Sequence, residues 1–158
     1  MSASPAELSL LAIADMVREI RTANGWQSEA GADVRLSPWF AEIADAQQTQ
    51  ALVYESSETP VGGADLDGTM RKVRMEQVVF IEVYARPLHG REAQQYAQIK
   101  ADLRRCILAP LGARLIYDGA EIGSIYFRGV SLIDDARALG LIGARATVAV
   151  KYTENVQH

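Results

Sequence analysis

Apolar residues near the start of the chain recur at the spacing of one helix face. They lie three or four positions apart, with charged residues at most of the positions between them. Ser4 and Glu7 have the spacing of a capping box, and Pro5 suits the first helical position, so a helix can begin here. Gly25 provides a stop, because glycine accepts the left-handed conformation that ends many helices. The pattern predicts an amphipathic helix over residues 5–23.

Several later segments alternate apolar and polar residues with the period of two that is typical of strands. The alternation is strongest over 73–85. Within the segment 122–133, Gly123 and Gly129 predict a bulge or a bend. The apolar residues of 91–108 return to helical spacing and predict a second helix. The other predicted strands cover residues 32–36, 50–55 and 144–152.

The order of these elements decides the expected fold class. Most strands follow one another through connections too short for helical crossovers, so we predict an α+β fold with two α-helices on an antiparallel or mixed β-sheet. Residues 1–158 show no internal repeat and no shift in composition, which favours a single domain. Serines, glycines and charged residues over 56–72 predict an extended loop between two strands. In the irregular segment before it, Trp39, Phe40 and Ile43 are expected to form a small apolar anchor.

Composition narrows the class of protein without indicating a function. Hydrophobic residues make up 49% of the 158 residues and charged residues 23%, which is typical of a folded soluble core. The net charge of −4 disfavours broad nucleic-acid binding by the whole fold. The single cysteine, Cys106, cannot form an internal disulfide, and this is typical of a reducing compartment. We expect no membrane span, because no apolar run approaches the roughly 20 residues that a spanning helix needs.

Residues that could carry chemistry are few and scattered. His89 and His158 are the only histidines, and neither has partners at the spacing of a zinc site or in a nucleophile motif. We interpret His89 as a surface residue at a helix entrance, and Cys106 as a buried apolar residue rather than a reactive thiol. Asp134 and Asp135 are interpreted as turn residues at the end of a strand. The sequence therefore predicts no catalytic residue, no metal site and no cofactor, and we do not expect an enzyme.

Charged residues of both signs lie in and beside the predicted 56–72 loop. Acidic residues come first, and basic residues follow where the loop rejoins the next strand. Of the 16 basic residues in the chain, 13 are arginine, the side chain best suited to bidentate contacts with carboxylates. The cluster is either a solvated strand edge or a subunit interface, and both interpretations stay open. The interface hypothesis assigns the contact to Glu58, Asp65, Asp67, Arg71, Lys72 and Arg74.

The order of the expected elements also indicates a family. The chain has an N-terminal amphipathic helix, the 56–72 loop, the strand over 73–85 and the helix over 91–108. Its short motifs are Ala32-Asp33-Val34, Leu52-Val53-Tyr54 and a final strand that ends Val148-Ala149-Val150-Lys151-Tyr152. In this order the chain resembles the tail terminator and tail-completion (minor tail) proteins of long-tailed bacteriophages. The resemblance covers most of its length.

The resemblance implies a structural virion protein without an active site. Six copies would form a ring that caps the tail tube, ends tube polymerisation and provides the interface to the head connector. The implied partners are further copies of the chain, the tail tube protein and the connector or neck proteins, while DNA passes through the lumen without specific binding. Such a protein is assembled in the cytoplasm of the bacterial host and resides at the head-proximal end of the tail in the virion.

Two alternatives stay open. One is a head–tail joining or neck protein of related fold. The other is an unrelated enzyme or small-ligand-binding protein. Symmetry and contacts in a tail reconstruction would separate the terminator from the neck protein, and a gene neighbourhood of capsid, connector and tube genes would separate both from the enzyme.

Overall fold

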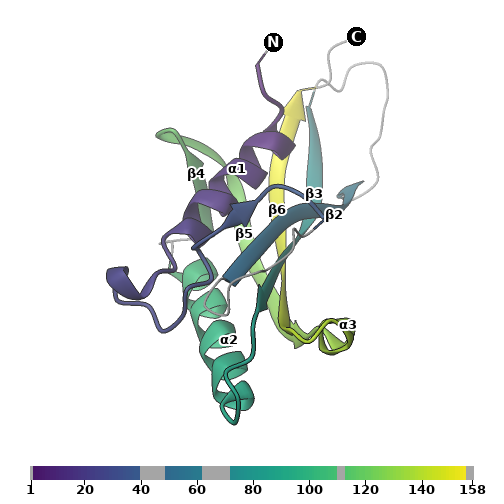
Figure 1. The fold of residues 1–158 in the computed structure, drawn as a ribbon. Helices are drawn as coiled ribbons and strands as arrows, with labels where there is room; N and C mark the ends of the chain where they lie inside the picture. The colour runs from purple at the N-terminus through teal and green to yellow at the C-terminus, as the bar shows by residue number, and fades with distance from the viewer. Residues whose placement is uncertain (1, 40–48, 62–71, 110–112, 156–158) are drawn as a thin grey trace.

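The computed structural model describes residues 2–39, 49–61, 72–109 and 113–155. Within these residues, six strands form one mixed sheet in the order β1-β2-β3-β6-β5-β4 (Figure 1). The strands are β1 (Val34–Arg35), β2 (Thr49–Pro60), β3 (Lys72–Ala85), β4 (Arg114–Tyr117), β5 (Ala120–Leu132) and β6 (Ile142–Asn155). The helices are α1 (Pro5–Arg18), α2 (Glu92–Leu108) and the short α3 (Asp134–Ala138), with a 3-10 turn at Thr22–Asn24.

The sheet is built around β3 and β6, which pair along their whole length from Lys72 opposite Asn155 to Ala85 opposite Ile142. Only β1 and β2 are parallel, and all other neighbouring strands of the described chain are antiparallel. The mixed sheet carrying helices agrees with the expected α+β class, whereas the pattern did not predict β4 or α3. Among the described helices, none is both long enough and apolar enough to cross a membrane.

The first helix begins as predicted and ends earlier than the predicted range 5–23. The Ser4 side chain accepts the Glu7 N–H, and the Glu7 carboxylate accepts the Ser4 N–H, which completes the capping box. The carbonyl of Ile20 accepts the N–H of Gly31 at 2.8 Å. The chain therefore pairs with a later segment here, instead of continuing the helical hydrogen bonds.

β2 is longer than predicted, and the predicted 56–72 loop is correspondingly shorter. After a bulge between Glu55 and Ser57, the strand continues along β3 to Pro60. The bulge absorbs one extra residue, and the polar side chains beyond it are tolerated because this end of the strand is exposed. The expectation that the loop begins at residue 56 is therefore wrong. Residues 62–71 of the connection lie outside the described residues.

β4 and β5 form a hairpin that the hydrophobic pattern did not predict. Asp118 and Gly119 form its turn, and both have positive φ angles, of 50° and 76°. A two-residue hairpin turn needs this conformation, and Asp-Gly is a common sequence for it. The predicted irregularity of β5 is confirmed, because the pairing register shifts beside Gly123 and again beside Gly129.

The face of the sheet beneath α1 and α2, called here the covered face, carries the main apolar core. The inward residues of β6 are those predicted, Ala146, Val148, Val150 and Tyr152. Gln77 of β3 interrupts the apolar pattern on this face. It is fully buried, and its side-chain amide donates to the Ala6 carbonyl at 3.2 Å and to the Glu55 carboxylate at 3.1 Å. These two bonds connect the start of α1 to β2 and β3.

The apolar anchor expected before β2 is not formed by Trp39. The exposed fraction of this residue is 81%, so its ring lies outside the core. For Trp39 the expectation is wrong, because the spacing of apolar residues shows where a side chain could pack, without showing that a partner surface is present. Phe40 and Ile43, the other members of the expected anchor, lie outside the described residues.

Candidate interaction surface

The second face of the sheet has no long helix packed on it among the described residues. We call it the open face. At one end, Ala136 of α3 packs with Leu52 and Tyr84. The rest of the face is formed by side chains of β2, β3, β5 and β6 that point away from α1 and α2, namely Tyr54, Arg74, Glu76, Val78, Phe80, Glu82, Tyr126, Arg145, Thr147 and Lys151.

A carboxylate, a guanidinium and two aromatic rings occupy the middle of the open face. Glu82 accepts the Nε and Nη2 hydrogens of Arg145 at 2.8 and 2.6 Å, and the hydroxyl of Tyr54 donates to it at 2.8 Å. The Arg145 guanidinium also lies 4.7 Å from the centre of the Phe80 ring. Burial, followed by the bond to Glu82, raises the pKa of Tyr54 to about 12. These groups satisfy one another, so they hold the sheet together and leave no free acid or base.

A second cluster, nearer the start of β3, has more cations than carboxylates. Glu76 pairs with Arg128 at 3.0 Å and with Lys151 at 3.8 Å. The Lys151 ammonium also lies 5.2 Å from the centre of the Tyr126 ring. Arg74 is exposed on the same face and forms no ion pair with another described residue. We call Arg74, Arg128 and Lys151 the basic patch.

At the same end of the sheet, the covered face carries carboxylates. Glu55, Glu58 and Glu154 surround the buried Tyr152, and we call these three glutamates the acidic patch. Partial burial raises the pKa of Glu55, and Glu58 raises it further, against a lowering by the bond from Gln77. None of the three forms an ion pair with a described basic residue.

The six residues of the interface hypothesis are only partly described. Glu58 belongs to the acidic patch on the covered face, opposite Gln77 of β3. Lys72 and Arg74 are exposed and lie on the open face, so the structure does not bring them to Glu58 within one chain. Asp65, Asp67 and Arg71, the remaining three, lie outside the described residues.

Sequence reasoning missed the partners that the sheet brings together. Glu76 lies opposite Lys151, and Glu82 lies opposite Arg145, across β3 and β6. The alternation of each strand gives the face on which these residues lie. The pairing register, which sequence alone does not supply, decides which of them meet.

The residues that were considered for catalysis or metal binding have surroundings that agree with a structural interpretation. Cys106 is buried in α2, and burial raises the pKa of its thiol to about 12, with a further contribution from Asp102. His89 is exposed at the entrance of α2. Asp134 and Asp135 are exposed in the first turn of α3. The described residues contain no group of three or more His, Cys, Asp or Glu side chains that could hold a metal ion.

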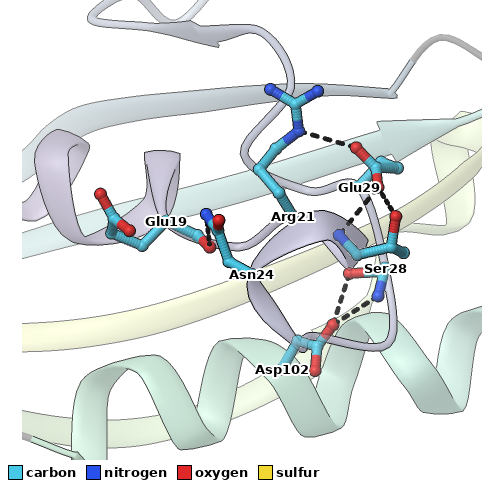
Figure 2. A network of polar contacts seen from close by, with 7 residues as sticks. Glu19, Arg21, Asn24, Ser28, Glu29 and Asp102 are labelled. Atoms are coloured by element: carbon cyan, nitrogen blue, oxygen red, sulfur yellow. Dashed lines mark hydrogen bonds and ion pairs between the residues drawn. The ribbon is translucent and has the colours of Figure 1, made fainter.

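A buried carboxylate on α2 fixes the loop that follows α1, as Figure 2 shows. Asp102 is only 1% exposed. It accepts the backbone N–H of Gln27 at 3.0 Å, the N–H of Ser28 at 2.7 Å and the Ser28 hydroxyl at 2.7 Å. Three donors on one carboxylate explain how a charged residue is tolerated in the interior.

The same loop closes on itself through Glu29, which is also drawn in Figure 2. Its carboxylate accepts the Arg21 guanidinium at 2.7 Å, the Thr22 N–H at 2.8 Å and the Thr22 hydroxyl. The Thr22 bond and then the Arg21 bond lower the pKa of Glu29. Asn24 donates to the carbonyl of Glu19 at 3.1 Å. The carboxylates of Asp102 and Glu29 are both bonded to groups of this loop or its ends, so the network is a clamp for the loop.

A groove of about 900 Å³ lies between the start of α2 and the junction of α3 with β6. Its lining is mostly apolar, with one cation and two carboxylates among the residues Pro87, Glu92, Ala93, Tyr96, Leu132, Ile133, Asp134, Arg137, Gly140, Leu141, Ile142 and Gly143. The groove is the feature on which a small-ligand-binding alternative would rest.

Comparison with known proteins adds no family to this description. No model of a known protein family matches the sequence, and no curated protein matches it. A function is therefore argued from the order of the elements along the chain, together with the geometry and charge of the surfaces described above.

Proposed function

We propose that the chain is a structural protein of a bacteriophage virion, a tail terminator that caps the tail tube as a ring. In this role it ends tube polymerisation and provides the interface to the head connector. The observation that carries the proposal is the open face. It is a broad sheet surface, built by the long strands β3, β5 and β6, that no long helix of the described chain covers.

The composition of the open face supports a protein partner. Antiparallel sheets often have one wet face, but such a face usually carries polar side chains. Here aromatic rings and arginines stand among the other charged side chains, and both residue types are enriched at protein interfaces. Tyr126 has an exposed fraction of 44%, and Phe80 is half-buried. Arg145 lies over the Phe80 ring and Lys151 over the Tyr126 ring, and both cations pair with glutamates of β3, so the rings have defined neighbours within one chain.

The hydrogen-bond partners of the best-coordinated carboxylates support a structural role over the enzyme alternative. Glu29, Glu82 and Asp102 have the most donors around them, and each is bonded to groups that hold the fold. Cys106, the candidate nucleophile, is buried with a raised pKa, which disfavours the reactive thiolate. The acids with the most hydrogen-bond donors, and the buried cysteine, therefore stabilise the fold.

The proposed assembly is a ring of six copies at the head-proximal end of the tail. One rim contacts the tail tube protein and the other contacts the connector or neck proteins, with DNA passing through the lumen. The ring forms in the cytoplasm of the bacterial host. A closed ring also accounts for sheet edges that would otherwise be free, since a neighbouring copy can shield them.

Tube assembly in the presence of the chain tests the proposal. Tail tube protein is polymerised with and without the purified chain, and tube lengths and tube ends are measured by electron microscopy. We expect shorter tubes, each with a ring of extra density at one end. Tubes of unchanged length without end density would contradict the proposal. Tubes of unchanged length, together with binding of the chain to the head connector, would support the head–tail joining alternative instead.

A further inference from the structure

The acidic and basic patches lie at one end of the sheet, on opposite faces. Glu58 of the acidic patch is on β2 opposite Gln77, and its side chain lies on the covered face. Arg74 and Lys151 of the basic patch lie on the open face, on either side of the pairing between β3 and β6. The chain therefore carries negative charge on the covered face and positive charge on the open face, separated by the thickness of the sheet.

Neither patch is neutralised within the described chain. In the basic patch, Glu76 is the one described carboxylate that pairs with Arg128 and Lys151, and Arg74 pairs with none. In the acidic patch, three carboxylates gather around Tyr152 without a described cation. Like charges held close together are unfavourable, and Glu58 adds to the rise that partial burial already causes in the pKa of Glu55. A partner that brings the opposite charge relieves both patches.

We infer that the partner is a second copy of this chain, whose acidic patch docks on the basic patch of its neighbour. Because the two patches are different surfaces on opposite faces, the contact is head-to-tail, and repeated contacts of this type close into a ring when the rotation between copies permits it. The inference rests on the proposed function and deepens it by naming the two surfaces that meet between subunits.

Side chains, rather than added backbone pairing, make this contact. The outer part of β2 has a bulge between Glu55 and Ser57 and ends at Pro60, and both features oppose the addition of another strand at this edge. The exposed Tyr126 ring lies beside Lys151, so it supplies apolar area next to the charges. The contact thus combines an aromatic anchor with charges that set partner orientation.

A charge swap between the two patches tests the inference. One variant carries Glu55→Lys with Glu58→Lys, and the other carries Arg74→Glu with Lys151→Glu. All four side chains are exposed. Matched controls change the same charge at exposed sites elsewhere, with Glu19→Lys plus Glu121→Lys and with Arg91→Glu plus Arg104→Glu. Circular dichroism and thermal unfolding first establish that every variant is folded.

Self-association is then measured by light scattering and sedimentation over a concentration series. We expect each patch variant alone to associate at least about 10-fold more weakly than the wild-type chain, because like charges then face each other. An equal mixture of the two patch variants should recover association to within about 3-fold of wild type, since lysine now meets glutamate at one junction and the original charges meet at the next. A ring of six permits this alternation because six is even. The controls should associate like the wild type.

The outcomes separate this inference from the proposed function. If the variants and their mixture all associate like the wild type, or if the wild-type chain stays monomeric, the inference is wrong. If the variants fail singly and recover together but no form shortens tail tubes, the inference stands and the terminator function is wrong. If tubes are capped equally by the wild type and by each patch variant, the function stands and the subunit contact lies elsewhere.

Discussion

The covered and open faces belong to the same strands, yet they are completed in different ways. On the covered face, β3 contributes fully buried apolar residues such as Val79 and Ile81, which pack against α1 and α2. On the open face, the next residues along the same strand are Phe80 and Glu82, which are held by rings and ion pairs. Within the described residues, two long helices therefore cover one face, whereas the other face has α3 at one end and is otherwise held by contacts between neighbouring strands.

This difference separates stability from recognition. Burial of apolar area on the covered face is the larger source of stability, because each buried aliphatic side chain contributes about 1.5–3 kcal/mol. Ion pairs that stay partly exposed contribute much less. The open face thus contributes less to the free energy of unfolding than the covered face does. Its contacts hold rings and charges in positions where another protein surface can bind them.

The largest expected effect is a difference in the free energy of unfolding between two substitutions, one on each face of the sheet. Leu103 of α2 is fully buried against the covered face, and Leu103→Ala should lower the free energy of unfolding by about 2–5 kcal/mol. Tyr126→Ala removes a larger side chain from the open face and should cost less than about 1 kcal/mol in the isolated chain, because the ring is already exposed. Urea unfolding of both variants measures the difference. Equal losses would show that the open face is part of the folding core.

The loop that lies against α2 provides the next test. Asp102→Ala leaves the N–H groups of Gln27 and Ser28 without their acceptor in a partly buried setting, so we expect a loss of about 1–3 kcal/mol. Hydrogen exchange should also become faster at these two amides. Arg104→Ala, at an exposed position of the same helix, is the control and should change stability by less than about 0.5 kcal/mol. A stable Asp102→Ala variant with unchanged exchange would contradict the clamp.

A smaller effect is expected from the ion pair on the open face. Glu82→Gln keeps an acceptor for Tyr54 and removes the charge that Arg145 binds, so the expected loss is about 1–2 kcal/mol. Self-association, measured by light scattering, should stay within about 3-fold of wild type, because Glu82 lies outside both charged patches. Loss of association in a variant of normal stability would place the contact in the middle of the face.

The smallest expected effect depends on pH. The folded-state pKa of Glu55 is raised, so the folded chain binds this proton more tightly than the unfolded chain does. The resulting stability is present at low pH and is lost as pH rises through the folded pKa. Glu55→Gln should therefore stabilise the monomer at pH 7 by less than about 1 kcal/mol, a small gain because the side chain is exposed.

Urea unfolding of dilute protein at pH 7 and at about pH 4 measures this gain, which should shrink at the lower pH, where the carboxyl is largely protonated. Glu19→Gln, an exposed glutamate at the end of α1, is the matched control. A variant that is less stable than wild type at pH 7 would show that the acidic patch is not under strain.

Local signals in the sequence predicted the elements that depend on them. The capping box at Ser4 and Glu7 is present, and the alternation over 73–85 becomes β3 with nearly the same bounds. The glycines of β5 stand beside the register shifts that they indicated. In each case, the signal lies in residues that are close together in the sequence.

Features that depend on distant partners were not predicted. Polar residues after Glu55 continue β2 because β3 is long enough to pair with them, and composition alone indicated a loop. Asp118-Gly119 was a usable hairpin signal, but β4 before it has only 4 residues and the register of its pairing with β5 shifts, so no clear alternation marks the hairpin. The clusters around Glu76 and Glu82 required the register between β3 and β6. The candidate surface was therefore visible in the sequence only as separate charges.

If another copy of the chain completes the open face, the Tyr126 ring becomes covered on assembly, and radical footprinting measures that change. The rate at which hydroxyl radicals modify this ring is measured by mass spectrometry in dilute monomer and in assembled rings or capped tubes. Trp26, which packs under Arg105 on the side of α2, serves as the internal reference. We expect strong protection of Tyr126 on assembly, with Trp26 unchanged. Equal modification of Tyr126 in monomer and assembly would show that no second copy covers this part of the open face.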